Sequence, residues 1–306
     1  MTRTYDLVMT HHLDADDYFI QRVQWHCAAA GLNFFLIEPL WVREFQEALR
    51  ANRVWARALI NMHSEHHQPE DIYHQLILLA AERNILLVDP PAVALAAFDK
   101  ARLHPQLEAA GIPVPPTVIV PAEAAAAFQL SAADRERLGS PFVIKPCRGY
   151  GRRGVLLKAE SEADLAASMA QWPDSHYLLQ KRIVPALVGE EPAYFRVFYV
   201  FGAVWSCWWN CHNDRYRLMS TADHGAWQLD RAEAKVRRIA ALTGMNFFST
   251  EFAFTEDRKF VAIDYVNDQC HLLSQSISPA NGVPDSLVAA IAKQLVEGVR
   301  SRIQKS

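Results

Sequence analysis

One stretch of the chain combines a lysine with a glycine-rich loop, the residue types that can bind phosphate. In Pro141 to Val155, PFVIKPCRGYGRRGV, an apolar run ends at Lys145 and meets a loop with three glycines and three arginines. Glycines let backbone N–H groups approach phosphate oxygens, and a lysine beside them can place a point charge on a phosphate. An ordinary β-hairpin turn with solvated arginines fits the same letters. No Gly-Lys-Ser/Thr follows, so the loop is not a Walker A loop.

A second stretch, FFSTEFAFTEDRKFVAIDYVNDQCHL, holds acidic side chains within apolar strands. Glu251 lies in one predicted strand and Asp264 in the next, and Asn267 and Asp268 follow at its end. On paired antiparallel strands such side chains can face one another. Carboxylates and an amide oxygen are ligands that Mg²⁺ takes, usually together with substrate phosphates. Unpaired carboxylates are costly in apolar surroundings, so these acids either hold a metal ion or pair with arginines such as Arg238.

Length and composition limit the class of protein. The 306 residues exceed the size of roughly 250–300 at which one core stops growing, so we expect two or three subdomains. A net charge of −3 predicts no binding to nucleic acid or to an anionic membrane. The N-terminal stretch does not resemble a signal peptide, no apolar run approaches roughly 20 residues, and the five cysteines are scattered. We therefore expect a cytoplasmic protein with free thiols.

The elements that must position these residues follow from periodicity. In the first ninety residues, four predicted strands alternate with helical stretches, which favours a parallel, Rossmann-like α/β layer. No G-x-G-x-x-G follows the first strand, so a dinucleotide site is not expected there. The strands are predicted at 5–10, 33–39, 54–62 and 85–90.

The rest of the chain reads as a small α+β layer followed by a larger antiparallel sheet. The prolines around Val114 mark a boundary, and the alanine-rich stretch 122–139 is predicted to be helical. Residues 256–259 form a tight connection between two strands. An amphipathic helix from about Ser286, with Asp285 as its N-cap, closes the chain.

Five motifs in this order resemble the ATP-grasp superfamily, in particular carboxylate-amine ligases with a glutathione synthetase-like ATP-binding domain. The resemblance covers about residues 90 to 275. It rests on FDKARLHPQLEAAGIPVPPT, PFVIKPCRGYGRRGV, YLLQKRIV, YFRVFYVFGAV and the pair STEFAF and AIDYVND. It implies an α/β plus α+β fold with a Rossmann-like N-terminal domain (1–95), a small ATP-grasp subdomain with a glycine-rich lid (96–180) and a C-terminal subdomain with the metal site (181–306).

The resemblance implies contacts to ATP, residue by residue. Lys100 and Lys145 match the two lysines that contact the phosphates. Gln180 stands where the family's hinge often has Glu, and Glu191, or Glu190 in its place, would bind the ribose hydroxyls. The glycines of the lid match Gly149, Gly151 and Gly154, and the backbone facing adenine matches Lys181, Arg182 and Ile183.

Catalytic and metal positions follow from the same resemblance. Arg196 matches a basic position after the hinge, and Arg215 or Arg217 would stabilise charge at the transferred phosphoryl group. The Mg²⁺ ligands match Glu251, Asp264 and Asn267. The family usually spaces the last two ligands two residues apart. Here they are three apart, so either a bulge restores the alignment or Asp268 is the ligand.

The activity implied is ATP-dependent ligation of a carboxylate to an amine, or to a thiol, through an acyl phosphate. The cofactors would be ATP and Mg²⁺, or Mn²⁺ in its place, and the substrates small molecules; nucleic acid and membrane are not expected partners. The oligomeric state is left open, with a homodimer as one candidate. An ATP-grasp kinase acting on a hydroxyl, and a nucleotide-binding protein without catalysis, are the alternatives.

Two histidine-bearing loops follow the first and third predicted strands. One, THHLDADD, contains His11 and Asp17; the other, HSEHH, contains His63. Ligands of α/β sheets bind at the carboxyl ends of the strands, so these loops are candidates to contact the second substrate. A solvated, capped loop is the alternative for both.

Overall fold

The computed structural model describes residues 2–11, 17–63, 68–149 and 151–305. The chain divides into two compact units. Unit 1 contains residues 1–95, 195–249 and 267–306, and unit 2 contains residues 96–194 and 250–266. Within the described residues, no helix is both long and apolar enough to cross a lipid bilayer. All five cysteines are free thiols, as the sequence predicts.

Unit 1 begins with the predicted parallel sheet, whose strand order is β2-β1-β3-β4. Apolar side chains of the strands and of α2 and α3 form one core cluster that includes Phe45, Leu59 and Leu76. The strands are β1 (Arg3–Thr10), β2 (Phe34–Ile37), β3 (Val54–Ile60) and β4 (Leu86–Val88). The helices are α1 (Asp17–Ala29), the short η2 (Pro39–Trp41), α2 (Val42–Arg50), α3 (Ile72–Glu82) and α4 (Pro91–Phe98), which runs on into unit 2.

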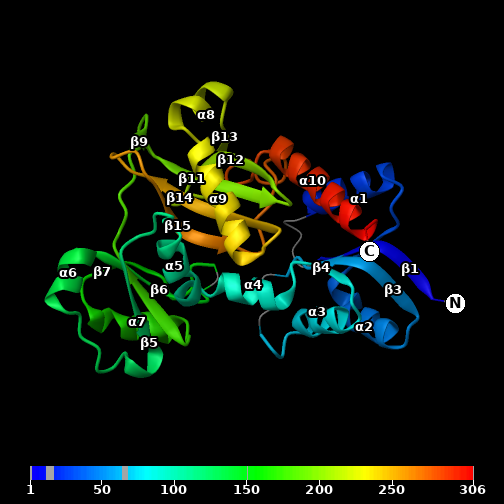
Figure 1. Cartoon of the computed structure of the whole chain (residues 1–306), viewed down its shortest axis with the longest axis horizontal. Coiled ribbons are helices and arrows are strands. Elements are labelled where there is room, and N and C mark those ends of the chain that lie inside the picture. Colours follow the sequence, from blue (N-terminus) through cyan, green and yellow to red (C-terminus); the bar gives the residue numbers. More distant parts are fainter. Residues whose placement is uncertain (1, 12–16, 64–67, 150, 306) are drawn as a thin grey trace. The chain divides into compact units, whose positions relative to one another are not determined.

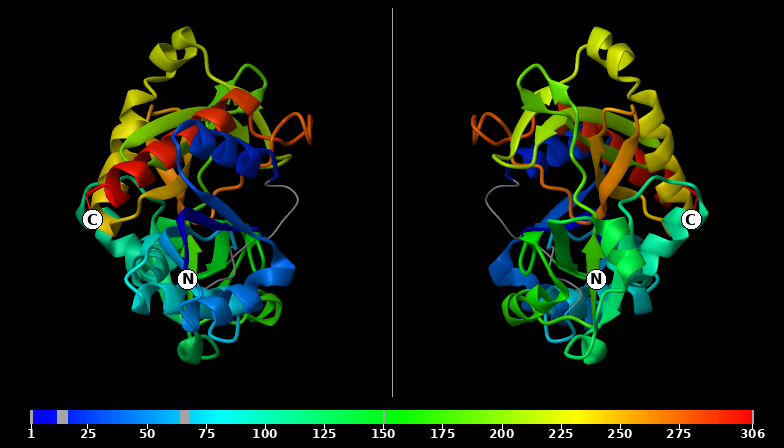
Figure 2. Two further views of the ribbon diagram at one scale, coloured as in Figure 1. Left: turned by 90° about the vertical axis from the view of Figure 1, so that its right-hand side faces the viewer. Right: turned by 90° about the vertical axis from the view of Figure 1, so that its left-hand side faces the viewer.

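Helix α10 (Asp285–Ile303) brings the end of the chain back to this sheet. It lies against α1 and β3, and Figure 2 shows α1 and α10 running next to each other. Its apolar residues Leu287, Ile291, Leu295 and Val299 are buried, as the predicted amphipathic pattern requires. Asp285 is the first helical residue rather than the N-cap, which is Pro284. The Asp285 carboxylate instead accepts a hydrogen bond from the Ser276 backbone N–H at 3.0 Å.

A five-stranded sheet has the order β13-β12-β11-β14-β15. The pairs β11–β12 and β12–β13 are antiparallel, and α9 lies against β12. The predicted connection at 256–259 joins β14 to β15, and residues 250–266 of this hairpin belong to unit 2. The elements are β11 (Tyr194–Val200), β12 (Ala203–Asn210), β13 (Arg215–Leu218), α8 (Thr221–Trp227), α9 (Asp230–Thr243), β14 (Phe247–Phe254) and β15 (Phe260–Asn267).

Unit 2 contains an antiparallel sheet of order β5-β8-β6-β7, with α7 against β6 and α5 against β8 (Figure 1). Its core includes Phe142, Ile144 and Leu179. The strands are β5 (Thr117–Pro121), β6 (Phe142–Pro146), β7 (Leu156–Ala159), β8 (His176–Gln180), β9 (Leu187–Val188) and β10 (Glu191–Pro192). The helices are α5 (Lys100–Ala109), η3 (Ala122–Ala124), α6 (Ala132–Leu138), η4 (Glu162–Asp164) and α7 (Leu165–Gln171).

The parallel α/β layer followed by antiparallel sheets confirms the predicted fold class. The alanine-rich stretch 122–139, predicted to be helical, is helical only in part. It forms the short η3, a turn, and then α6, whose N-cap Ser131 accepts a hydrogen bond from the Asp134 N–H. Alanine has the highest helix propensity, but tertiary context overrides propensity, and a strong N-cap in the middle of the stretch starts a new helix.

Gly298 in α10 allows close contact with another part of unit 1. A Cβ atom added there would lie 2.0 Å from the ring of Phe201, whose other contacts include the Arg302 guanidinium 4.0 Å from the ring centroid. Gly225 in α8 provides a matched comparison, because a Cβ there would have no atom within 4 Å. The glycine in α10 is therefore required by the ring and not by the backbone.

We predict that Gly298→Ala lowers the free energy of unfolding by about 1–3 kcal/mol, because the ring of Phe201 must shift. Gly225→Ala should leave stability unchanged or raise it by up to about 1 kcal/mol through helix propensity. Chemical denaturation of both variants measures the difference. Equal stability of the two variants would contradict the predicted contact.

Candidate functional site

Two lysines and two carboxylates, all from unit 2, form the centre of the candidate site. Lys100 begins α5, and its Nζ lies 3.4 Å from Asp264 Oδ1. Lys145 on β6 donates a hydrogen bond from Nζ to the backbone oxygen of Ile263 at 2.8 Å. The charges of Asp264 and Glu251 both act on Lys145. The structure thus brings together the lysine and acid motifs that lie far apart in the sequence.

Strand alternation explains why Lys145 and Gln180 lie on one face of the unit 2 sheet. Phe142 and Ile144 of β6 belong to the core cluster, so Lys145 points to the opposite face. On β8, Leu179 faces the same core, and Gln180 therefore faces with Lys145. The backbone N–H of Lys100 donates to the Cys147 carbonyl at 2.9 Å, which attaches the start of α5 to the end of β6.

Lys145 is buried although it carries a charge. The pKa of its ammonium group is lowered to about 8: burial is the largest cause, the positive charge of Lys100 also lowers it, and Asp264 and Glu251 act in the opposite direction. A cation held in this way is only partly compensated by the protein. Residues with pKa values shifted in this way occur often at functional sites, so Lys145 is a candidate to bind an anion.

The glycine loop joins β6 and β7 and contains residues with different roles. Gly151 has φ +57° and open space around it, which suits backbone that a ligand can approach. Gly154 is held by its neighbours: a Cβ there would lie 2.7 Å from Trp172 Cβ and 2.8 Å from Pro146 Cγ. Gly149 has ordinary contacts, and residue 150 lies outside the described residues.

The arginines of this loop have protein partners. Arg148 forms an ion pair with Asp99 at 2.9 Å, and its backbone N–H donates to Asp174 at 2.6 Å. Asp99 is also the N-cap of α5, since it accepts from the Arg102 N–H. Arg153 lies over the ring of Trp172 at 5.3 Å. The pair Asp99–Arg148 therefore connects the loop to the helix that carries Lys100.

The predicted hinge begins where β8 ends. The Lys181 N–H donates to the Pro116 carbonyl at 2.9 Å, and residues 181 to 186 lie outside regular structure. The Ala186 N–H then donates to the Phe254 carbonyl at 2.7 Å, at the end of β14. Glu191 lies on the short strand β10, which pairs with β9.

Three residues that sequence reasoning missed lie around Gln180. Its Nε2 donates to Thr117 Oγ1 and to the Tyr265 hydroxyl, both at 2.8 Å, and that hydroxyl lies 2.6 Å from His104 Nδ1. Tyr265 follows the candidate ligand Asp264, and His104 lies one helical turn after Lys100. Their spacing from predicted site residues was the only signal in the sequence.

Unit 1 carries the remaining predicted residues. Arg196 is buried, donates to Ser249 and Tyr216, and lies 5.4 Å from the ring centroid of Trp209. Arg215 and Arg217 on β13 are exposed, and Arg217 lies over Trp208. Asn267 donates to the Ser249 carbonyl at 3.3 Å. The roles given to these four residues stay predictions.

The histidine loops of unit 1 are held by acids. His11 lies 2.8 Å from Glu38 and 2.9 Å from Asp17, and the pKa of its ring is raised: burial lowers it, but hydrogen bonds and charges of the two acids outweigh burial. His63 Nε2 lies 3.0 Å from Asp71. The other histidines and acids of these loops, at 12, 14, 16, 65, 66 and 67, lie outside the described residues.

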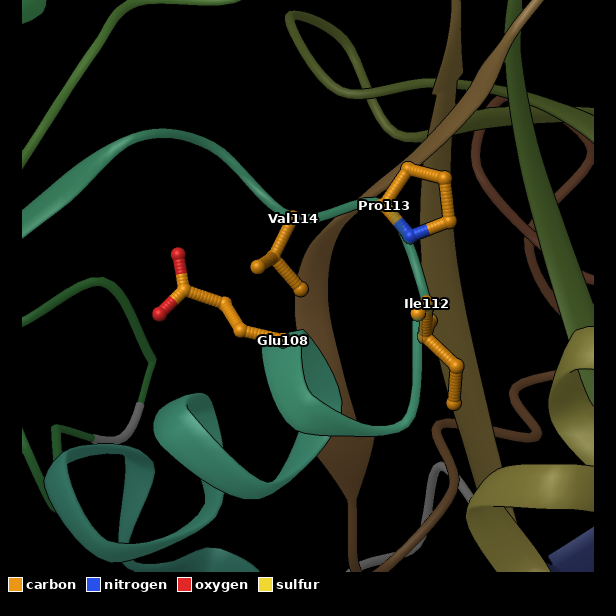
Figure 3. Close-up of a pocket in the computed structure, with 5 residues that line it drawn as sticks. Glu108, Ile112, Pro113 and Val114 are labelled. Atoms are coloured by element: carbon orange, nitrogen blue, oxygen red, sulfur yellow. The ribbon is translucent and has the colours of Figure 1, made fainter.

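Among the described residues, no three His, Cys, Asp or Glu side chains form a group that could hold a metal ion alone. One surface depression of about 340 Å³ lies at the end of α5 and is lined by residues between Glu108 and Val114 (Figure 3). The lining does not include the two lysines. The cluster of two lysines and two carboxylates is thus separate from this depression.

No family model matches the chain. Over 90 residues it is 36% identical to a D-alanine–D-alanine ligase from Frankia casuarinae; the match covers 29% of this chain and 22% of that protein's length. The chain therefore spans about a fifth of the curated relative that it matches.

Solved structures match along nearly the whole chain. The D-alanine–D-alanine ligase from Bacillus anthracis complexed with ATP aligns with a TM-score of 0.66 and 12% identity, covering 100% of this chain and 99% of that one. The ATP-grasp ligase PsnB complexed with minimal precursor, Mg and ADP aligns with a TM-score of 0.60 and 14% identity, covering 97% and 98%. The chain has the ATP-grasp fold.

The ATP-grasp fold confirms the architecture that the motifs predicted, over more of the chain than residues 90 to 275. Those two solved structures contain ATP in one case and Mg and ADP in the other. At these identities the likeness concerns the fold, so the contacts of Lys100, Lys145, Glu251 and Asp264 with a nucleotide stay predictions.

We predict that Lys145→Met makes stability less dependent on pH. The folded pKa of Lys145 lies near 8 and the unfolded value near 10.5, so the unfolded state binds more protons between these values. Stability of the unchanged protein should therefore rise with pH across this window, by on the order of 3 kcal/mol, and the variant should lack this rise. Urea denaturation from pH 7 to 10.5 measures it.

Lys158→Met is the control, because Lys158 is exposed on β7 of the same sheet. This variant should keep the pH dependence of the unchanged protein. If the free energy of unfolding of Lys145→Met depends on pH as that of the unchanged protein does, the pKa of Lys145 is not lowered by burial.

Proposed function

We propose that this ATP-grasp protein is an ATP-dependent ligase that joins a carboxylate to an amine, or to a thiol, through an acyl phosphate. The observation that carries the proposal is the cluster of Lys100, Lys145, Glu251 and Asp264 in unit 2. Two cations suit phosphate oxygens, and two carboxylates suit the metal ion that accompanies them.

The donor set fits Mg²⁺. Glu251 and Asp264 offer hard carboxylate oxygens, and Mg²⁺ commonly takes one or two carboxylates together with substrate phosphates and waters. A site of only two protein acids is therefore suited to an ion that arrives with ATP. Lys100, 3.4 Å from Asp264, would contact the phosphates that share this ion. Mg²⁺ would supply charge neutralisation at the phosphate oxygens.

The other end of the nucleotide would lie along the hinge. The backbone of Lys181 to Ile183 continues from β8 outside regular structure and can present N–H and C=O groups to adenine. Gln180 lies on the same sheet face as Lys145, so the hinge and the phosphate-binding lysine belong to one surface. Glu191 is the proposed partner of the ribose hydroxyls.

The residues in this cluster act by position and charge. Lys145 and Lys100 would neutralise charge on the transferred group and hold it in line with an acceptor carboxylate. The open backbone at Gly151 would let the loop cover the phosphates and exclude water from the acyl phosphate. Attack by the amine or thiol then displaces phosphate, so no covalent intermediate with the protein is required.

We predict that ATP, Mg²⁺ and the correct carboxylate–amine pair release ADP and inorganic phosphate, with neither substrate sufficient alone. Asp264→Asn should lower kcat/KM by roughly 100-fold or more, because a ligand of the charge-neutralising ion is lost. Asp257→Asn is the matched control, since Asp257 is exposed in the turn of the same hairpin. A screen of paired amino acids with a phosphate assay makes the measurement.

Three outcomes would contradict the proposal. Full activity in Asp264→Asn would remove the metal assignment. A phosphorylated product without free phosphate would identify a kinase acting on a hydroxyl, and ATP binding without turnover on broad panels would identify a nucleotide-binding protein.

A further inference from the structure

We propose that His104 is a positioning residue of the nucleotide site: through Tyr265 it fixes the side chain of Gln180 and the ring beside Lys145. The proposal rests on the proposed function in one respect, because it takes this surface of unit 2 to bind the nucleotide. It concerns a residue that the charge cluster does not contain and that lies in the first motif without any role assigned to it there.

The contacts form one chain through the interior of unit 2. His104 on α5 lies 2.6 Å from the Tyr265 hydroxyl of β15, which lies 2.8 Å from Gln180 of β8. Gln180 also contacts Thr117 of β5 at 2.8 Å. These four residues are buried, and the chain connects one helix with three strands. Lys145 Nζ lies 5.4 Å from the centroid of the Tyr265 ring.

The carbonyl of Pro115 determines the direction of every hydrogen bond among Thr117, Gln180, Tyr265 and His104. Thr117 Oγ1 lies 2.7 Å from the Pro115 carbonyl, which can only accept, so the Thr117 hydroxyl donates there. Thr117 must then accept from Gln180, and this requires the amide nitrogen of Gln180 to face it. The same nitrogen faces Tyr265, so the Tyr265 oxygen accepts as well.

The direction of these bonds leaves His104 one role. The Tyr265 hydroxyl has a single hydrogen, and with its oxygen accepting from Gln180 that hydrogen donates to His104 Nδ1. His104 is therefore neutral, with its proton on Nε2, which lies 3.5 Å from Glu108 at the rim of the depression in Figure 3. A protonated ring would direct a second N–H at the Tyr265 oxygen.

The charges around His104 agree with a neutral ring. Burial lowers the pKa of His104; Glu108 on the same helix acts to raise it, and the positive charges of Lys145 on β6 and Arg137 on α6 lower it. Tyr265 of β15 completes the groups that face the ring. The acceptor on Nδ1 is thus present at neutral pH.

The consequence for the site is that both N–H groups of the Gln180 amide are used inside the protein. The amide cannot rotate without breaking bonds to Thr117 and Tyr265, so Gln180 keeps one orientation at the start of the hinge. If His104 cannot accept, the Tyr265 hydroxyl loses the acceptor of its hydrogen, and the hydrogen bond that the same oxygen accepts from Gln180 is weakened. His104 therefore acts on the nucleotide through two other residues.

The experiment compares His104→Asn with His104→Leu. Asn places Oδ1 where Nδ1 lies and keeps an acceptor, whereas Leu has similar size and no acceptor. Titration calorimetry with Mg-ADP measures affinity without requiring turnover. We expect His104→Leu to weaken binding about 10-fold, because it removes the acceptor for the Tyr265 hydroxyl. The affinity of His104→Asn should stay within about 2-fold of that of the unchanged protein, because this variant keeps an acceptor. Equal affinity of the Leu variant and the unchanged protein would overturn the proposal.

A second measurement reads the network without any nucleotide. The ¹⁵N shifts of His104 in the ligand-free protein identify the protonated ring nitrogen, and we expect the proton on Nε2 at pH 7. A proton on Nδ1 would overturn the proposal. If the unchanged protein binds no Mg-ADP while the proton lies on Nε2, the proposed function fails, and the positioning role fails with it although the hydrogen-bond chain stands.

Discussion

The positive charge on Lys145 is the feature on which the rest of the candidate site depends. A buried ammonium group loses its hydration, and burial lowers its pKa to about 8. The protein compensates in part, with the Ile263 carbonyl at 2.8 Å and the charges of Glu251 and Asp264, while Lys100 adds a second cation nearby. This balance explains why acids occur in strands that are otherwise apolar, and why a polyanionic ligand would complete the site.

Backbone pairing between distant segments brings together the two lysines and two carboxylates of the site, which are not neighbours in the sequence. Alternation on β6 and β8 places Lys145 and Gln180 on one face, with Phe142, Ile144 and Leu179 in the core on the other. Helix α5 is attached to β6 by the Lys100 N–H, and the acidic hairpin of β14 and β15 supplies the carboxylates. The hydrogen-bonded chain from His104 to Gln180 then connects the helix to the strands.

Much of the fold and the charged centre could be predicted from the sequence. The parallel layer follows from strand and helix alternation, and the grouping of Lys100, Lys145 and Asp264 follows from motif order. What the sequence did not predict depends on contacts between distant segments. Arg148 pairs with Asp99, and Gly154 is required by Trp172, because the loop folds back onto elements far from it in the chain. The sequence pattern within one segment does not predict such contacts with distant segments.

A crystal structure with Mg²⁺ and a non-hydrolysable ATP analogue tests the central claim most directly. If the four side chains form the phosphate site, phosphate oxygens will lie roughly 3 Å from Nζ of Lys100 and Lys145, and Mg²⁺ will lie about 2.1 Å from oxygens of Glu251 and Asp264. Nucleotide bound away from both lysines, or a metal ion held without either acid, would contradict the assignment.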